Sequence, residues 1–110
     1  MATGDDASFT VDVRREADRV VVAPEGELDI ATVPRLAEVM RSHDNARSVV
    51  LDLRALRFLD TSGLRAVIDE ERRAGAEGRR FAIVRGPVAV QRVFELAGVA
   101  DRLPFVAEGT

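Results

Sequence analysis

Asp60, Thr61, Ser62 and Gly63 place a carboxylate, two hydroxyls and a glycine at a junction between two hydrophobic patterns. Before them runs an apolar, strand-like stretch, residues 49–53, and after them apolar residues recur at the i, i+3, i+4 spacing of a helix. The first backbone N–H groups of a helix have no intrahelical partner, and with the positive end of the helix dipole they favour an anion. A phosphate on the oxygen of Ser62 would therefore be tolerated there, and a partner could reach it.

A serine in a turn between a strand and a helix is also typical of α/β-hydrolases, but the glycines that flank their nucleophile are missing here. The single histidine, His43, falls at the end of a predicted helix and away from this turn, so a Ser-His-acid triad is not expected. Asp60 and Gly63 are one residue too far apart for the Asp-Thr-Gly of an aspartic peptidase. Because the sequence also has no cysteine, no lysine and no phosphate-binding glycine loop, we expect no enzymatic activity.

Structural roles explain the same residues if each is taken alone. Asp60 has the residue type and position of a helix N-cap. Ser62, in the first helical turn, would satisfy a backbone N–H group by itself. Neither structural role excludes a functional one. A function at this turn is indicated only when these residues are considered together with the rest of the sequence.

Composition limits the class of protein. The chain has 110 residues, enough for one domain, with 46% hydrophobic and 32% charged residues as in ordinary globular proteins. A net charge of −3 gives no reason to expect a nucleic-acid partner. No apolar run approaches a membrane span, and the acidic start lacks the order of a signal peptide, so a cytoplasmic location is expected. The acidic clusters at residues 5–6 and 69–71 are expected to serve solubility rather than to bind metal, and no cofactor is expected.

The first half of the chain predicts a hairpin, a helix and a central strand. Alternating and apolar runs at residues 9–13 and 19–23 predict two antiparallel strands, and residues 24–29 are expected to break the pattern. A helix is predicted to start after the N-cap Thr32 and to end near residues 42–43. The strand at 49–53 follows.

The second half alternates helices and strands. The helix after Ser62 is predicted to stop at Gly75, and a buried strand follows at residues 80–84. Another helix is expected to close at Gly98, and a short strand at residues 103–106 would be confined to a sheet edge by its proline. Residues 1–7 are expected to form a flexible N-terminal tail and residues 107–110 a C-terminal tail.

This order predicts an α/β domain with a mixed, mostly parallel sheet that opens with an antiparallel hairpin and has helices packed on it. Crossover connections bring the loops after the second, third and fourth predicted strands to one edge of the sheet. Those loops are residues 27–32, 58–63 and 85–87, so Ser62 is expected near Asp29, Asp60 and the start of the third helix.

Three motifs in order, at residues 26–29, 58–64 and 87–99, resemble the STAS domain family, and most of all single-domain bacterial anti-sigma factor antagonists. The similarity covers nearly the whole chain, with the domain assigned to residues 8–106, and its most specific part is the Asp-Thr-Ser-Gly-Leu segment at 60–64. The resemblance implies that Ser62 is the acceptor of a regulatory phosphate. The residues implied to bind the partner are Asp29, Asp60, Thr61, Gly63 and Leu64.

The resemblance also implies a partner-switching mechanism. The unphosphorylated antagonist would bind an anti-sigma factor that is a serine kinase of the GHKL type, which frees a sigma factor. Phosphorylation of Ser62 would separate the complex, and a PP2C-type phosphatase would restore the serine. Two alternatives stay open: the STAS subunit of a lipid-transporting ABC complex, and an enzyme that uses the same edge of the sheet.

Overall fold

The computed structural model describes residues 8–106; the predicted tails at 1–7 and 107–110 lie outside the described residues. The elements, in chain order, are β1 (Thr10–Glu16), β2 (Arg19–Leu28), α1 (Val33–Arg41), β3 (Ser48–Asp52), β4 (Leu56–Leu59), α2 (Thr61–Ala76), β5 (Arg80–Val84), α3 (Val88–Leu96), the 3-10 helix η1 (Ala100–Arg102) and β6 (Phe105–Val106).

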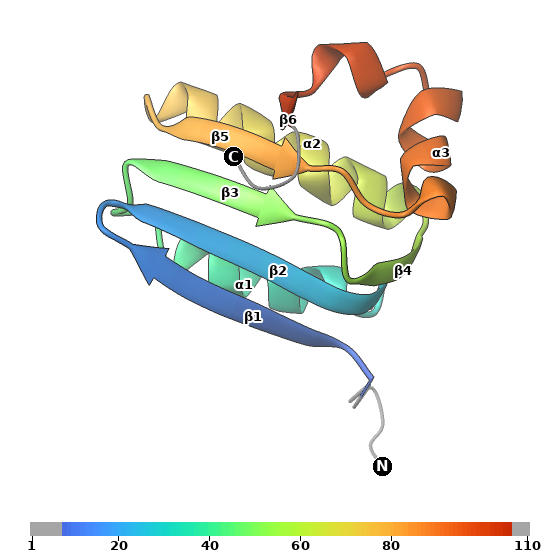
Figure 1. Cartoon of the computed structure of the whole chain (residues 1–110), viewed down its shortest axis with the longest axis horizontal. Coiled ribbons are helices and arrows are strands. Elements are labelled where there is room, and N and C mark those ends of the chain that lie inside the picture. The colour runs from blue at the N-terminus through green and yellow to red at the C-terminus, as the bar shows by residue number, and fades with distance from the viewer. Residues whose placement is uncertain (1–7, 107–110) are drawn as a thin grey trace.

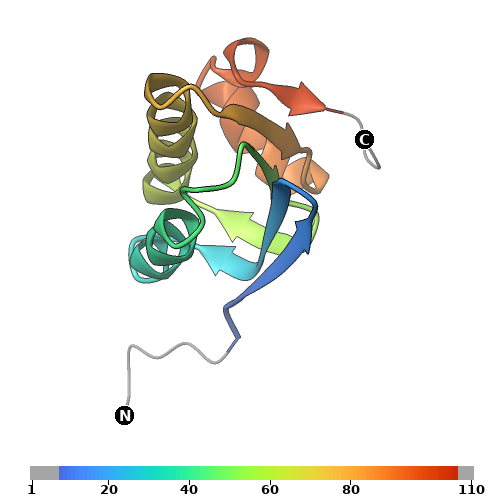
Figure 2. The ribbon, with the colours of Figure 1, turned by 90° about the vertical axis from the view of Figure 1, so that its left-hand side faces the viewer.

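The strands form one mixed sheet with the order β1-β2-β3-β5-β6, and β4 pairs with β2 off this path. Only the opening hairpin of β1 and β2 is antiparallel, and the other pairs are parallel. Figure 2 shows α1 and α2 on one face of the sheet, and Figure 1 shows α3 beyond the end of β5 and near β4. The predicted fold class is confirmed, including the edge position of β6.

β2 is twice as long as predicted, and the expected break at residues 24–29 was wrong. Its first half pairs with β3 from Arg19 to Val22, and its second half pairs with β4 from Gly26 to Leu28. Pro24 falls between these two pairing segments, and a register shift follows at Gly26, which has a φ of 114°. A Cβ atom at Gly26 would also lie 2.5 Å from the carbonyl oxygen of Ser8, so only glycine fits this bend.

β4 is an element that the sequence did not predict. After β3 the chain turns at residues 54–55, and the N–H of Gly26 donates to the carbonyl of Ala55 over 3.2 Å. The next four residues run parallel to the end of β2, and Leu59 lies opposite Leu28. Phe58 is therefore a strand residue rather than a loop residue. Because β4 runs beside β2, α2 begins next to the end of β2.

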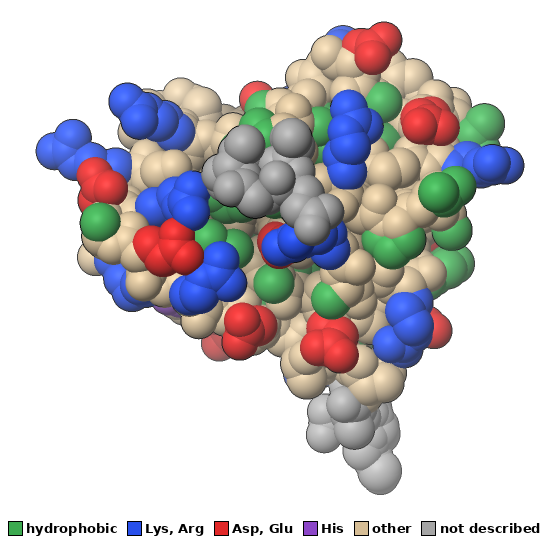
Figure 3. Space-filling model, viewed as in Figure 1, with side chains coloured by type: hydrophobic (Ala, Val, Ile, Leu, Met, Phe, Trp, Pro, Cys, Tyr) green, Lys and Arg blue, Asp and Glu red, His purple; other side chains and the backbone are tan. Residues whose placement is uncertain are grey.

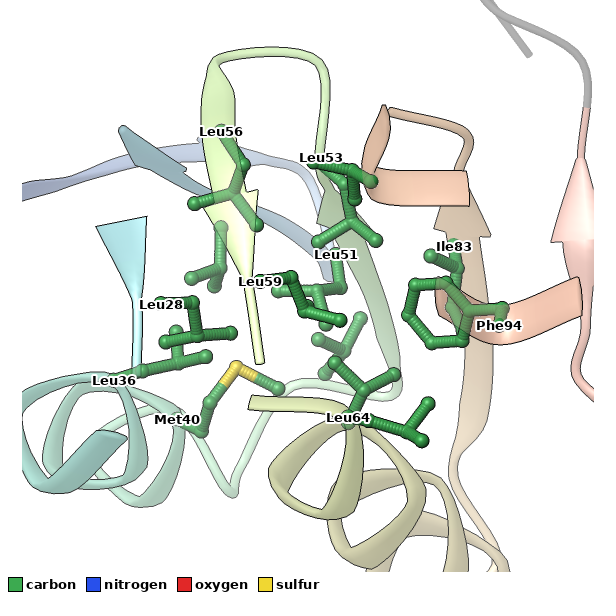
Figure 4. Close-up of a cluster of buried hydrophobic side chains, with 14 of the residues drawn as sticks. Leu28, Leu36, Met40, Leu51, Leu53, Leu56, Leu59, Leu64, Ile83 and Phe94 are labelled. Carbon is green, nitrogen blue, oxygen red and sulfur yellow. The ribbon is translucent and has the colours of Figure 1, made fainter. Parts of the chain in front are cut away.

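The core lies between the sheet and the helices (Figure 4). Leu28, Leu51 and Leu59 come from strands and meet Leu36 and Leu64 from α1 and α2. These three strand residues point to the face that the helices cover, and because the side-chain period of a strand is two, a neighbour such as Val50 points to the other face. Burial of this kind, at about 25 cal/mol per Å² of apolar surface, is what holds the helices in place.

The opposite face of the sheet, seen in Figure 3, has no helix over it and carries acidic and basic side chains side by side. A smaller apolar cluster of Val21, Val50 and Val84 lies on it. At its rim the Arg54 guanidinium binds the carboxylate of Asp52 at 2.8 Å. This open face is distinct from the sheet edge at which α2 begins.

Candidate functional site at the start of helix α2

Helix α2 begins at a capped turn, as the residue types predicted. Asp60 is the N-cap with extended backbone, and its Oδ1 accepts a hydrogen bond of 3.0 Å from the N–H of Gly63. Its backbone N–H in turn donates to the carbonyl of Leu28 over 3.3 Å. Asp60 therefore satisfies one of the unpaired N–H groups of the helix and ties the turn to the end of β2.

Gly63 is required by packing at this point. A Cβ atom on it would lie 2.6 Å from the backbone oxygen of Leu28 and 3.1–3.2 Å from the side chains of Leu28 and Leu59. Any larger residue would push the first turn of α2 away from the sheet. The motif glycine and Leu64, both buried, therefore fix where the preceding hydroxyls stand, and neither offers much surface to a partner.

Ser62 is the second residue of α2 and is partly exposed, whereas Thr61 before it is exposed. Among the described residues the structure gives neither hydroxyl a hydrogen bond. The expectation that Ser62 serves a backbone N–H group is therefore not met, since Asp60 takes that role. Ser62 is left with a reachable hydroxyl at the positive end of a helix of 16 residues.

Asp29 lies at the same edge of the sheet, in the turn between β2 and α1. Its carboxylate accepts from the N–H groups of Ala31 and Thr32 at 3.0 and 3.2 Å. Thr32 holds the N-cap position of α1 but does not cap it with its side chain, because the buried hydroxyl donates to the carbonyl of Glu27 at 2.7 Å. Asp29 thus shapes the loop beside the site, a structural role that the sequence did not reveal.

A pocket of about 480 Å³ lies between the starts of α1 and α2 and has Ser62 on its wall. Its lining is mixed, with apolar side chains on the α1 side and mostly polar ones along α2. The lining residues are Ile30, Val33, Pro34, Thr61, Ser62, Arg65, Ala66 and Asp69. The structure therefore brings the loop after β2 together with the start of α2, as the crossover argument predicted.

The third loop does not join them. A Cβ atom on Gly86 would lie 2.8 Å from the backbone oxygen of Leu53, so residues 85–87 pack over the end of β3. The N–H of Gly86 donates to the side-chain oxygen of Gln91 at 2.8 Å, and no residue of this loop lines the pocket at Ser62. The prediction that α3 begins next to Ser62 was wrong, because β4 separates the end of β3 from the start of α2.

Exposed apolar residues were missed as site candidates. Ile30, next to Asp29, is 76% exposed, and Val88 at the start of α3 is 75% exposed. Phe58, part of a quoted motif but not selected, is 47% exposed. An apolar residue in a polar loop was the available signal for Ile30. Of these three residues only Ile30 lines the pocket beside Ser62, so only Ile30 adds apolar surface to the candidate site.

His43 is remote from the site, as predicted. It follows the C-terminal end of α1, where its Nδ1 lies 3.0 Å from the carbonyl oxygen of Val39. The pocket at Ser62 is lined by Val33 and Pro34 from the opposite end of the same helix, roughly 13 Å away along its axis at 1.5 Å per residue. No Ser-His-acid triad is assembled by the described residues.

Within residues 8–106 no cluster of histidine, cysteine and carboxylate side chains has the makeup of a metal site. In the same range, no helix combines the length and the apolar character that crossing a membrane requires. The structure also shifts the pKa of Asp52, at the end of β3. Burial alone would raise the pKa of its carboxyl, but hydrogen bonds from Arg54 outweigh this and hold the pKa below its usual value.

The domain defined by this sheet and by the turn before α2 matches the STAS domain model over residues 10–108, and the chain belongs to the STAS domain family. An anti-sigma-B factor antagonist of Staphylococcus aureus (strain NCTC 8325 / PS 47) is 31% identical over 87 residues, which cover 77% of this chain and 80% of that protein.

Solved structures give the same result. An anti-sigma factor antagonist from Mycobacterium paratuberculosis superposes with a TM-score of 0.80 at 28% identity, covering 89% of this chain and 85% of that one. The phosphorylated form of the Bacillus cell fate determinant SpoIIAA has a TM-score of 0.68 at 20% identity, covers 90% and 89% of the two chains, and shows the shared fold.

Proposed function

We propose that this protein is an anti-sigma factor antagonist of the cytoplasm that acts by partner switching at Ser62. The observation that carries the proposal is the position of Ser62, a reachable hydroxyl in the first turn of α2 that is not engaged in holding the fold of the described residues. Relatives that are anti-sigma factor antagonists support it, because they match the chain over most of its length.

In this proposal the unmodified protein binds an anti-sigma factor that is also a serine kinase of the GHKL type. Ile30 and the pocket beside Ser62 supply apolar contact area. Thr61, on the pocket wall, and the nearby Asp29 and Asp60 supply polar contacts. Since Gly63 and Leu64 are buried, they contribute by fixing the geometry of the turn. The kinase then transfers a phosphate from ATP to Ser62, and a PP2C-type phosphatase removes it.

The antagonist itself needs no catalytic group for this cycle. Nucleotide and magnesium belong to the kinase, and this chain contributes only the accepting hydroxyl. We therefore propose that the protein is not an enzyme and holds no cofactor.

Release follows from the charge of the phosphate. Phosphorylation adds about −1.5 to −2 charge at neutral pH. A phosphate 5 Å from one carboxylate of the partner is repelled by about 2 kcal/mol in water, and by more at a partly buried contact. A loss of about 3 kcal/mol weakens binding roughly 100-fold. The fold itself survives, because a negative charge is favourable at the start of a helix.

The test uses the purified chain and its cognate anti-sigma factor. We expect Ser62→Asp to lose binding while its thermal midpoint stays near that of the wild type. Ser62→Ala should bind and resist release when ATP is added. Thr61→Ala is the control for the site of phosphorylation, since it removes the neighbouring exposed hydroxyl and should still be phosphorylated on Ser62. It is not a control for binding, because Thr61 is itself a proposed partner contact.

Mass spectrometry after incubation with kinase and ATP decides the site. A phosphate on Thr61 in place of Ser62 would relocate the switch. No phosphate with any cognate kinase would contradict the proposal and favour the subunit of a lipid-transporting ABC complex.

A further inference from the structure

Arg65 stands one helical turn after Ser62 and lines the same pocket. Residues three apart on a helix lie on one face with about 5–6 Å between their Cβ atoms, so a guanidinium at 65 reaches a group attached to the oxygen of residue 62. Arg65 is exposed and, in the described part of the chain, makes no ion pair or hydrogen bond. A long cationic side chain thus lies free beside the serine.

The other charged groups around Ser62 are engaged or have the wrong sign. Arg35 of α1 donates to the carbonyl of Phe9 at 2.9 Å and lies over the ring of Phe9. The carboxylates of Asp60 and Asp29 accept backbone N–H groups in their own turns. Asp69, on the same pocket wall as Arg65, is acidic, so Arg65 is the one cation among the lining residues.

We propose that Arg65 is a positioning residue for the phosphorylated state: its guanidinium binds the phosphate on Ser62 within the same chain. The inference rests on the proposed phosphorylation of Ser62 and adds what holds the phosphate afterwards. A guanidinium presents parallel N–H donors that match two phosphate oxygens, and such charge-assisted pairs are stronger than neutral hydrogen bonds.

An ion pair between Arg65 and the phosphate on Ser62 would make the release of the partner more complete. In the unmodified protein Arg65 is available to the partner at the pocket rim. After phosphorylation it turns to the phosphate of its own chain, so one step adds a repulsive charge and withdraws a basic contact. The ion pair with Arg65 also stabilises the phosphorylated protein when it is not bound to the kinase, because Arg65 of the same chain neutralises part of the phosphate charge.

The test needs neither kinase nor phosphatase. Phosphoserine is inserted at position 62 of the full chain through an expanded genetic code, and its second ionisation is followed by phosphorus NMR at low ionic strength. The variants are Arg65→Gln, Arg65→Lys and the control Arg72→Gln. Arg72 is an exposed arginine on the same helix, ten residues or about 15 Å from Ser62.

A guanidinium that binds the dianion lowers the phosphate pKa from its usual value of about 6. We expect Arg65→Gln to raise that pKa by about 0.5 unit, the size of a good exposed ion pair. Arg65→Lys should keep part of the shift and Arg72→Gln should leave it unchanged. Added salt should shrink the difference between wild type and Arg65→Gln.

Equal titration midpoints for wild type and Arg65→Gln would overturn the proposal. A shift by Arg72→Gln as large as that by Arg65→Gln would overturn it too, since it would show a general effect of net charge. Because the phosphoserine is incorporated during translation and not by the kinase, this result is independent of the binding assays: failure of the Ser62 variants to alter binding would reject the proposed function and leave this titration intact.

Discussion

Replacing Asp60 by alanine tests whether the first turn of α2 is held as the structure indicates. The substitution removes the 3.0 Å hydrogen bond between Oδ1 and the N–H of Gly63, and with it the side-chain cap of the helix. Loss of an N-cap costs about 1 kcal/mol of unfolding free energy, within a range of about 0.5–2. For a domain of this size that is a drop of about 4–8 °C in thermal midpoint.

Two matched variants separate the cap from the charge. Asp60→Asn keeps an oxygen acceptor in place and should retain most of the stability, losing only the interaction with the helix dipole, about 0.3–1 kcal/mol. Asp69→Ala removes a carboxylate that is exposed on the same helix and has no hydrogen bond within residues 8–106, so it should be neutral.

Urea unfolding at neutral pH measures all of these variants on one scale, with the slope of each transition checked for constancy. If the free energy of unfolding is the same for wild type and Asp60→Ala, the capping argument is refuted, and with it the reason that the turn presents Ser62 as it does. If Asp60→Asn and Asp60→Ala are equally unstable, the effect belongs to the charge and not to the hydrogen bond.

Three further predictions concern neighbouring residues. Gly63→Ala places a Cβ atom 2.6 Å from the backbone of Leu28 and should cost at least about 1–3 kcal/mol; an unchanged thermal midpoint would show that α2 can shift freely. Asp29→Ala should also lower the midpoint, because it removes two acceptor contacts in the turn before α1, a cost that the sequence did not suggest. Asp52 has a lowered pKa, so it stabilises the native state above its ordinary value of 3.8, and this contribution is lost as the pH falls through the lower native value. The difference in unfolding free energy between wild type and Asp52→Asn should therefore shrink on acidification, and a difference independent of pH would contradict this.

The sequence by itself determined the fold class, most of the elements and the identity of the key turn. Alternation and apolar periodicity located the hairpin, the helices and the strand at residues 80–84, since those signals depend only on which face of an element is buried. The type and position of Asp60 predicted its role as a cap, because capping is local and involves residues within one turn.

Tertiary structure decided what depended on partners distant in the chain. β2 runs through Pro24 and Gly26 because it pairs with β3 first and β4 second, and no local pattern encodes such a change of neighbour. The short strand β4 is stable only beside β2, so its four residues read as a loop in the sequence.

The site follows the same division. That Ser62 sits in the first turn of a helix was evident from local spacing. Packing decided three other features. Asp29 holds its own loop, residues 85–87 lie over β3, and Arg65 shares a pocket with Ser62 and the start of α1. The physical reason is that a side chain's surroundings depend on which elements the hydrophobic core brings together, and several different packings satisfy one local pattern.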